Sequence, residues 1–138
     1  MVQGRGKICL YATAIPTINK SIGIELVTER HNDAIKLKTK LLKYPETSKV
    51  EFINNNFLNY NLDAIKSLKV LVWISNLCFD QEITNNIFKK IIYELPKGTI
   101  IACSKSYNFS DERIKKIVDI TVKMSWSNSS TVYCYLLE

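Results

Sequence analysis

The residues of this chain that are best suited to bind a small ligand follow one another in a fixed order of types: glycine, acid, amide and aromatic. They are Gly4, Gly6, Glu25, Asn56 and Phe57. Glycines let a ligand approach the backbone closely, and a carboxylate accepts hydrogen bonds from the two hydroxyl groups of a ribose. An amide followed by an aromatic ring can bond and stack an adenine. The order therefore predicts a site for a ligand that contains a nucleoside.

Each of these residues also has a simpler explanation. A Gly-x-Gly pair is commonly a turn, an acid after a strand is commonly solvated, Asn56 could form a turn and Phe57 could belong to the core. Their joint order favours the cofactor site, because motif spacing and strand position must agree at once. Cys9 stands where the third glycine of G-x-G-x-x-G would be. This favours S-adenosylmethionine over a nicotinamide dinucleotide as the cofactor.

The elements that must position these residues follow from the spacing of apolar side chains. The run 69–74 is almost continuously apolar, which is typical of a central strand of a parallel sheet with both faces covered. The spacing further predicts a short buried helix over 7–14, strands over 21–25, 49–54 and 99–103, and helices over 29–43 and 81–95.

The end of the chain predicts a hairpin. Residues 114–124 and 131–137 are rich in β-formers, and the cluster Ser127–Ser130 between them is prone to turn. Alternating strands and helices that end in a hairpin predict a three-layer α/β fold with a Rossmann-like, mostly parallel sheet. Ligands of such sheets bind beyond the carboxyl ends of the strands, where the candidate residues are expected to lie.

Composition indicates a single domain over residues 1–138. The chain has 138 residues, of which 46% are hydrophobic, enough for one ordinary core. Its 19 basic and 13 acidic residues give a net charge of +6. A positive field favours approach to phosphate-rich or acidic partners, so nucleic-acid contact through a basic surface is one expected role.

The four cysteines lie far apart, each in or beside an apolar run: Cys9, Cys78, Cys103 and Cys134. Without a CxxC pair and with one histidine, they predict buried, reduced thiols and no metal site. No stretch has the length of a membrane span or the pattern of a signal peptide. We therefore expect an intracellular protein without membrane partners.

The first half of the chain contains three segments that match motifs of one family. Residues 4–7 (Gly-Arg-Gly-Lys) resemble the latter half of an Asp-x-Gly-Ser-Gly-x-Gly-Gln motif. Residues 22–25 (Ile-Gly-Ile-Glu) resemble the motif of the family's second strand. Residues 54–57 (Asn-Asn-Asn-Phe) are similar to a Gly-Asp-Phe loop that binds adenine.

The second half continues the match in the same order. Residues 72–79 look like a Val-Asn-Asn-Phe-x-Phe stretch, and residues 98–105 look like a Gly-x-x-Ile-x-Ser-Lys strand. Residues 124–126, with the strand through Tyr133 and Tyr135, resemble a Ser-Trp element and a terminal tyrosine strand. Together these motifs are similar to the Dot1-like, non-SET histone lysine methyltransferases, which are class I S-adenosylmethionine-dependent enzymes.

The resemblance implies methyl transfer to a lysine amine of a nucleosomal histone, and hence a nuclear location; without the histone role we expect the cytoplasm. It implies that Asn76 lies beside the reacting methyl group, and that Trp126 and one terminal tyrosine line the lysine channel. Tyr133 fits an ungapped match and Tyr135 fits a one-residue insertion. Trp126 could instead be a core aromatic that anchors the hairpin. The implied cofactor-binding residues are Gly4, Gly6, Lys7, Glu25, Asn56 and Phe57.

The chain also departs from the family pattern. Asn56 replaces an aspartate and Lys7 replaces a glutamine, and both changes should lower the affinity for the cationic cofactor. Residues 1–3 cover only the end of the expected first strand, so we expect a domain truncated at its start. One alternative function is therefore a catalytically inactive remnant that binds nucleosomes or nucleic acid through basic residues. A small-molecule methyltransferase on the same fold is another.

Overall fold

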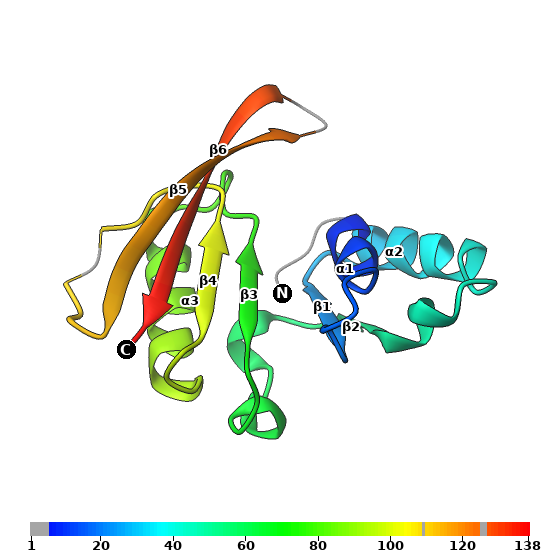
Figure 1. The fold of residues 1–138 in the computed structure, drawn as a ribbon, viewed down its shortest axis with the longest axis horizontal. Coiled ribbons are helices and arrows are strands. Elements are labelled where there is room, and N and C mark those ends of the chain that lie inside the picture. The colour runs from blue at the N-terminus through cyan, green and yellow to red at the C-terminus, as the bar shows by residue number, and fades with distance from the viewer. Residues whose placement is uncertain (1–5, 109, 125–126) are drawn as a thin grey trace. The chain divides into compact units, whose positions relative to one another are not determined.

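The computed structural model describes residues 6–108, 110–124 and 127–138, and it divides into two compact units, residues 1–60 and 61–138 (Figure 1). Each unit has strands and helices of its own, so they are taken in turn. The prediction of a single domain over 1–138 stays a prediction.

The first unit pairs two parallel strands, with Ser21 opposite Val50 at one end and Glu25 opposite Asn54 at the other. The carboxyl ends of the two strands are therefore level. Its elements are α1 (Lys7–Ala12), β1 (Ser21–Glu25), α2 (Thr28–Lys40), the short 3-10 helix η1 (Pro45–Lys49), β2 (Val50–Asn54) and η2 (Phe57–Asn59). Its core contains Cys9, Leu10 and Val50, with Leu37, Leu41 and Phe52 packed against them.

Local chemistry explains where the helices of this unit end. Thr13 caps α1, and its Oγ1 donates to the carbonyl of Leu10 at 2.7 Å. The hydroxyl of Thr47 donates to the carbonyl of Leu41 at 2.8 Å, beyond the end of α2. These bonds satisfy carbonyls that a helix end leaves without a partner. The expected helix over 7–14 is present, but only Cys9 and Leu10 of α1 are buried.

The second unit forms a four-stranded sheet in the order β3-β4-β6-β5. β3 and β4 are parallel, whereas β6 is antiparallel to both β4 and β5. The helix α3 lies on one face of the sheet (Figure 1). On that face the ring of Phe88 contacts that of Tyr135, with centroids 6.4 Å apart. The elements are η3 (Asp63–Ile65), β3 (Leu71–Ile74), α3 (Gln81–Glu94), β4 (Ile100–Cys103), β5 (Ile114–Met124) and β6 (Ser127–Leu137).

The predicted α/β class, the parallel strand pairs and the final hairpin are confirmed, but the turn of the hairpin was misplaced. Ser127–Ser130 lies inside β6 instead of forming the turn, and Met124 pairs directly with Ser127. Within this strand, Ser127 Oγ donates to the carbonyl of Ser129 at 3.0 Å and accepts from its amide at 3.2 Å. Composition alone marked the cluster as a turn, whereas pairing with β5 holds it extended.

The coverage of β3 also differs from the prediction. Val72 and Ile74 are 5% and 1% exposed, but Leu71 on the opposite face is 56% exposed. α3 is the one α-helix among the described residues of this unit, and its Phe88 packs on the face that carries Tyr135. The continuous apolar run therefore buries alternate residues, as in a half-covered strand.

Candidate functional site

The turn that opens α1 depends on Gly6. Its φ of 77° lies in the left-handed region, which side chains disfavour. A Cβ at this position would lie 2.7 Å from Cζ of Phe52 and 2.8 Å from Cβ of Ala34. Gly6 is thus required both by the backbone and by close packing against β2 and α2. Gly4 lies outside the described residues, and Lys7 is exposed at the start of α1.

Glu25 is the last residue of β1, and it is nearly buried. The residue is 5% exposed, and its Oε1 accepts a hydrogen bond from the amide of Val27 at 2.9 Å. A solvated acid needs no such partner, whereas a buried one is costly without it. The simpler explanation of Glu25 as a solvated acid is therefore wrong. Its position at the carboxyl end of a parallel strand fits a binding role.

Two apolar residues beside this carboxylate were missed in the sequence. Leu26 and Val27 are 66% and 43% exposed, immediately after β1. They present an apolar surface next to an acid, which suits a ligand that combines hydroxyl groups with a flat ring. The sequence contains a signal for them: two large apolar residues follow Glu25, at a position where a polar loop is expected.

Asn54, the last residue of β2, is a third contributor that sequence reasoning missed. Its Nδ2 donates to the carbonyls of Glu25 at 2.8 Å and Leu26 at 3.2 Å. Its Oδ1 accepts from the hydroxyl of Thr28 at 2.9 Å. The side chain of Asn54 therefore ties the end of one strand to the loop that follows the other. Only the parallel register, which places Asn54 opposite Glu25, could have indicated this.

Asn56 and Phe57 lie just beyond the carboxyl end of β2, where Asn56 is the N-cap of η2 and Phe57 is its first residue. Oδ1 of Asn56 accepts from the amide of Leu58 at 2.9 Å, so the side chain caps this short helix. Phe57 is 7% exposed, and its ring belongs to the core. The turn and core explanations both hold in this structure. A contact of either residue with adenine stays a prediction.

Asn76 follows β3 in the second unit and is 0% exposed. Its Nδ2 donates to the carbonyl of Lys105 at 3.2 Å, and its Oδ1 accepts from the amide of Lys105 at 2.9 Å. Its backbone amide donates to Oγ of Ser104 at 3.0 Å. Asn76 therefore joins the carboxyl ends of β3 and β4 through a closed set of hydrogen bonds. Its place beside a reacting methyl group stays a prediction.

The two candidate tyrosines of β6 differ in their surroundings. Tyr135 is 2% exposed, and its hydroxyl accepts from the amide of Tyr107 at 3.0 Å and donates to its carbonyl at 3.3 Å. Burial raises the pKa of Tyr135. Tyr133 is partly exposed, with Nζ of Lys116 5.5 Å from its ring centroid. A role in a substrate channel suits Tyr133 better, because Tyr135 is a core residue. Trp126 lies outside the described residues.

No disulfide joins the four cysteines, all of which lie within the described residues, and three of the thiols are buried as predicted. Cys78 is exposed instead, because it lies in the turn that connects β3 to α3. Burial raises the pKa of Cys103 to about 12, and its Sγ donates to the carbonyl of Lys105 at 3.2 Å. Such a thiol stays protonated and unreactive near neutral pH. The described residues contain no group of three histidine, cysteine or acidic side chains that could hold a metal.

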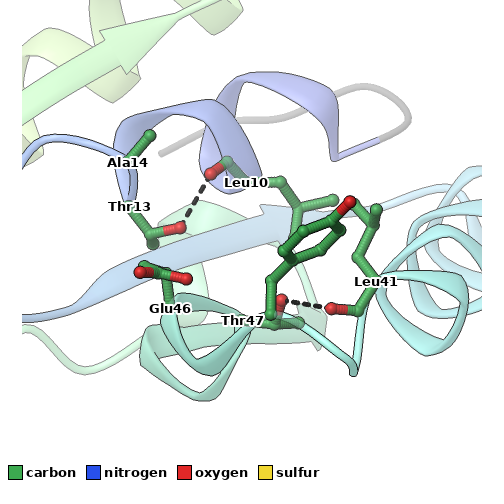
Figure 2. A pocket seen from close by; sticks show the side chains of 7 residues that line it. Leu10, Thr13, Ala14, Leu41, Glu46 and Thr47 are labelled. Atoms are coloured by element: carbon green, nitrogen blue, oxygen red, sulfur yellow. Dashed lines mark hydrogen bonds between the residues drawn. The ribbon is translucent and has the colours of Figure 1, made fainter.

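A shallow cavity of about 290 Å³ lies in the first unit, at the end opposite to Glu25 and Asn54. Figure 2 shows the side chains that line it. It lies beside the C-terminal ends of α1 and α2 and next to η1, which leads into the start of β2. Since β1 and β2 are parallel, this is the amino end of the strands, away from Glu25 and Asn54. The lining residues are Leu10, Thr13, Ala14, Leu41, Tyr44, Glu46 and Thr47. The cavity is therefore separate from the candidate site.

Within residues 6–108, 110–124 and 127–138, no helix has both the length and the apolar character needed to cross a bilayer.

Comparison with known proteins places the site in context. The family described as "Histone methylation protein DOT1" matches residues 2–134. None of the curated protein sequences matches this chain.

Solved structures share the fold at low sequence identity. An RNA methyltransferase from Salinibacter ruber, in complex with S-adenosyl-L-homocysteine, aligns with a TM-score of 0.66 and 16% identity, over 97% of this chain and 75% of its own. TrmK from M. capricolum, with the same cofactor product, aligns with a TM-score of 0.67 and 13% identity, over 98% of this chain and 59% of its own. Magnesium protoporphyrin IX methyltransferase from Synechocystis PCC 6803, with bound SAM, aligns with a TM-score of 0.69 and 9% identity. The alignment covers 98% of this chain and 66% of that enzyme. These likenesses confirm the Rossmann-like methyltransferase fold.

Proposed function

The chain belongs to the DOT1 family of histone methylation proteins, and we propose that it transfers a methyl group from S-adenosylmethionine to a lysine amine of a histone. Family and fold are both those of S-adenosylmethionine-dependent methyltransferases. One observation of the structure carries the proposal furthest. Glu25 is a nearly buried, backbone-bonded carboxylate at the carboxyl end of a parallel strand.

The residues of the first unit fit the cofactor. Glu25 has acceptor oxygens for ribose hydroxyls, and Leu26 and Val27 expose apolar surface beside it for a purine. Gly6 shapes the turn that opens α1, because the place a side chain would take is filled by Phe52 and Ala34. S-adenosylmethionine supplies, when bound, a sulfonium methyl group that an amine can attack. The chain's own work is to bind and orient, and for methyl transfer positioning contributes most of the rate.

Lys7 and Asn56 weaken the expected affinity without removing the site. Lys7 is exposed and brings a positive charge toward a cationic ligand, while Asn56 offers an amide in place of a carboxylate. Asn56 also uses its Oδ1 to cap η2. We therefore propose weaker cofactor binding than a family member with the acid and the glutamine would have.

The histone substrate is proposed from the family, and with it a nuclear location. Roles of Tyr133 and Trp126 in a lysine channel belong to the same proposal. Asn76 is assigned a positioning role, since the hydrogen bonds of its amide hold the backbone of Lys105.

Incubation with isotopically labelled S-adenosylmethionine and either nucleosomes or free RNA tests the proposal. We expect mass spectrometry to find labelled methyl groups on histone lysine in the wild-type reaction and none with Glu25→Ala. Glu29→Ala is the matched control, because Glu29 is an exposed acid in the first turn of α2. Label on RNA alone would replace the histone substrate with RNA, and label on neither would contradict the enzyme proposal.

A binding module without catalysis is the second candidate, favoured by the net charge of +6 and by exposed lysines on α2. Lys36 and Lys40 are exposed one turn apart, and basic side chains so placed suit phosphate groups. Binding that weakens steeply with salt, unchanged by Glu25→Ala, would support this role. Salt-independent binding would contradict it.

A further inference from the structure

The loop between β1 and α2 is held by a side chain from another strand. Val27, the residue before α2, makes no side-chain capping bond, so the helix start lacks the local cap that loops usually supply. Asn54 of β2 donates instead to the carbonyls of Glu25 and Leu26, at 2.8 and 3.2 Å, and accepts from the hydroxyl of Thr28 at 2.9 Å. One carboxamide thereby spans three of the four residues from 25 to 28.

The chemistry of these bonds requires an amide at position 54. Two of the partners are carbonyl oxygens, which only accept, and the third is a hydroxyl that donates. Only a side chain with both an NH₂ group and an oxygen satisfies all three. Aspartate would keep the bond from Thr28 but would place a charged oxygen against two carbonyl oxygens. Leucine, of similar size, would make none of the bonds.

The tether acts on Glu25 through Val27. The amide of Val27 donates to Oε1 of Glu25 at 2.9 Å, and Val27 lies between the two residues that Asn54 holds on either side, Leu26 and Thr28. The amide of Asn55 adds a bond to the carbonyl of Glu25 at 3.1 Å. The orientation of the carboxylate thus depends on where Asn54 keeps the loop.

We infer that Asn54 is a positioning residue that sets the affinity of the site for the ribose hydroxyls of the cofactor, an inference that rests on the proposed function. Its side chain acts on the loop and not on the ligand. It holds the backbone donor that aims the Glu25 carboxylate. Sequence similarity gave position 54 no such role. The residues that the tether joins are separated by 26 to 29 positions along the chain.

Calorimetric titration of the full chain with S-adenosylhomocysteine and with its 2′,3′-dideoxy analogue tests this inference. Asn54→Asp should weaken binding of S-adenosylhomocysteine about five-fold, the equivalent of about one net hydrogen bond. It should leave binding of the dideoxy analogue unchanged, because that ligand has no hydroxyl groups for Glu25. A general loss of structure would weaken both ligands alike and would overturn the inference, as would equal affinity of wild type and variant for S-adenosylhomocysteine.

Two further variants keep the test decisive. Asn32→Asp adds the same charge on an exposed face of α2 and should leave both affinities unchanged. Thr28→Val removes only the hydroxyl bond and should weaken S-adenosylhomocysteine about two-fold, so it replaces Asn54→Asp should that variant not fold. Unchanged affinity in Thr28→Val would then overturn the inference. A wild-type chain that binds neither ligand would overturn the proposed function itself, which is a different outcome from equal binding by wild type and variants.

Discussion

The carboxyl ends of the two parallel strand pairs are held together in different ways. At the end of β1 and β2, the tether is exposed: Asn54 bonds to a loop whose residues Leu26 and Val27 also face solvent. At the end of β3 and β4, the tether is buried: Asn76 is 0% exposed and exchanges hydrogen bonds with Ser104 and Lys105. The end of β1 and β2 therefore keeps exposed side chains that a ligand can contact. At the end of β3 and β4, the amide of Asn76 is engaged in hydrogen bonds that stabilise the fold.

This difference separates binding from stability. A buried amide leaves costly groups without partners when it is removed, while an exposed one is replaced by water. Substitutions at the end of β3 and β4 should therefore change the free energy of unfolding. Substitutions at the end of β1 and β2 should change ligand affinity. Gly6, in the turn that opens α1, is different, because its backbone and its packing both disfavour a side chain.

The largest effect should come from Gly6→Ala. The left-handed φ and the contacts at 2.7 and 2.8 Å should together lower the free energy of unfolding of the first unit by about 3 kcal/mol. Hydrogen exchange of amides in α1 and α2 measures this loss.

Gly98→Ala is the matched control in the second unit. Its φ is 85°, but nothing lies within 4 Å of a Cβ there, so only the backbone cost of about 1 kcal/mol applies. Equal losses at the two glycines would mean that packing against Phe52 and Ala34 contributes nothing.

Asn76→Ala should destabilise the second unit by about 2 kcal/mol, because it removes a fully buried amide that both donates to and accepts from the backbone of Lys105. Urea denaturation followed by circular dichroism measures the change. The control is Asn85→Ala, whose partly exposed amide accepts from Gln81 within α3. A loss at Asn76 no larger than that at Asn85 would refute the structural role of the buried tether.

Tyr135→Phe should cost about 1 kcal/mol, since the amide and carbonyl of Tyr107 both lose their bonds to its hydroxyl. Tyr133→Phe should leave the free energy of unfolding unchanged and should alter methyl transfer instead. The two variants, compared by denaturation and by activity, separate the core tyrosine from the channel tyrosine. The reverse pattern would assign the channel to Tyr135.

The smallest effect concerns pH. The guanidinium of Arg113 lowers the pKa of Asp111 to about 2, with a bond of 2.7 Å between them. The contribution of this exposed pair is therefore present above the ordinary pKa of 3.8 and is lost as pH falls toward 2. A carboxyl titration by NMR should place the pKa of Asp111 in Arg113→Gln between the wild-type value and 3.8, because the backbone amide of residue 113 still donates to its Oδ1. An unchanged pKa would mean that Arg113 is not its cause.

The sequence predicted elements better than it predicted contacts. The run 21–25 and the run 69–74 were identified because apolar β-formers lie between polar or turn-forming residues, and the structure has strands there. The prediction of a turn at Ser127–Ser130 was wrong, because composition cannot show that these residues pair with β5.

The site was predicted residue by residue, but not its connections. Glu25 was found from its place after a strand, while its burial and its bond from Val27 depend on a loop conformation. The tethers of Asn54 and Asn76 join residues that only strand register brings together. Spacing within one segment carries no information about such register.

Calorimetric titration of the chain with S-adenosylmethionine tests the central claim most directly. We expect saturable binding by wild type, at least ten-fold weaker in Glu25→Gln because the charged acceptor is lost, and unchanged in Glu29→Gln. No heat of binding at millimolar ligand, or equal binding by Glu25→Gln and wild type, would contradict the assignment of Glu25 as the cofactor carboxylate.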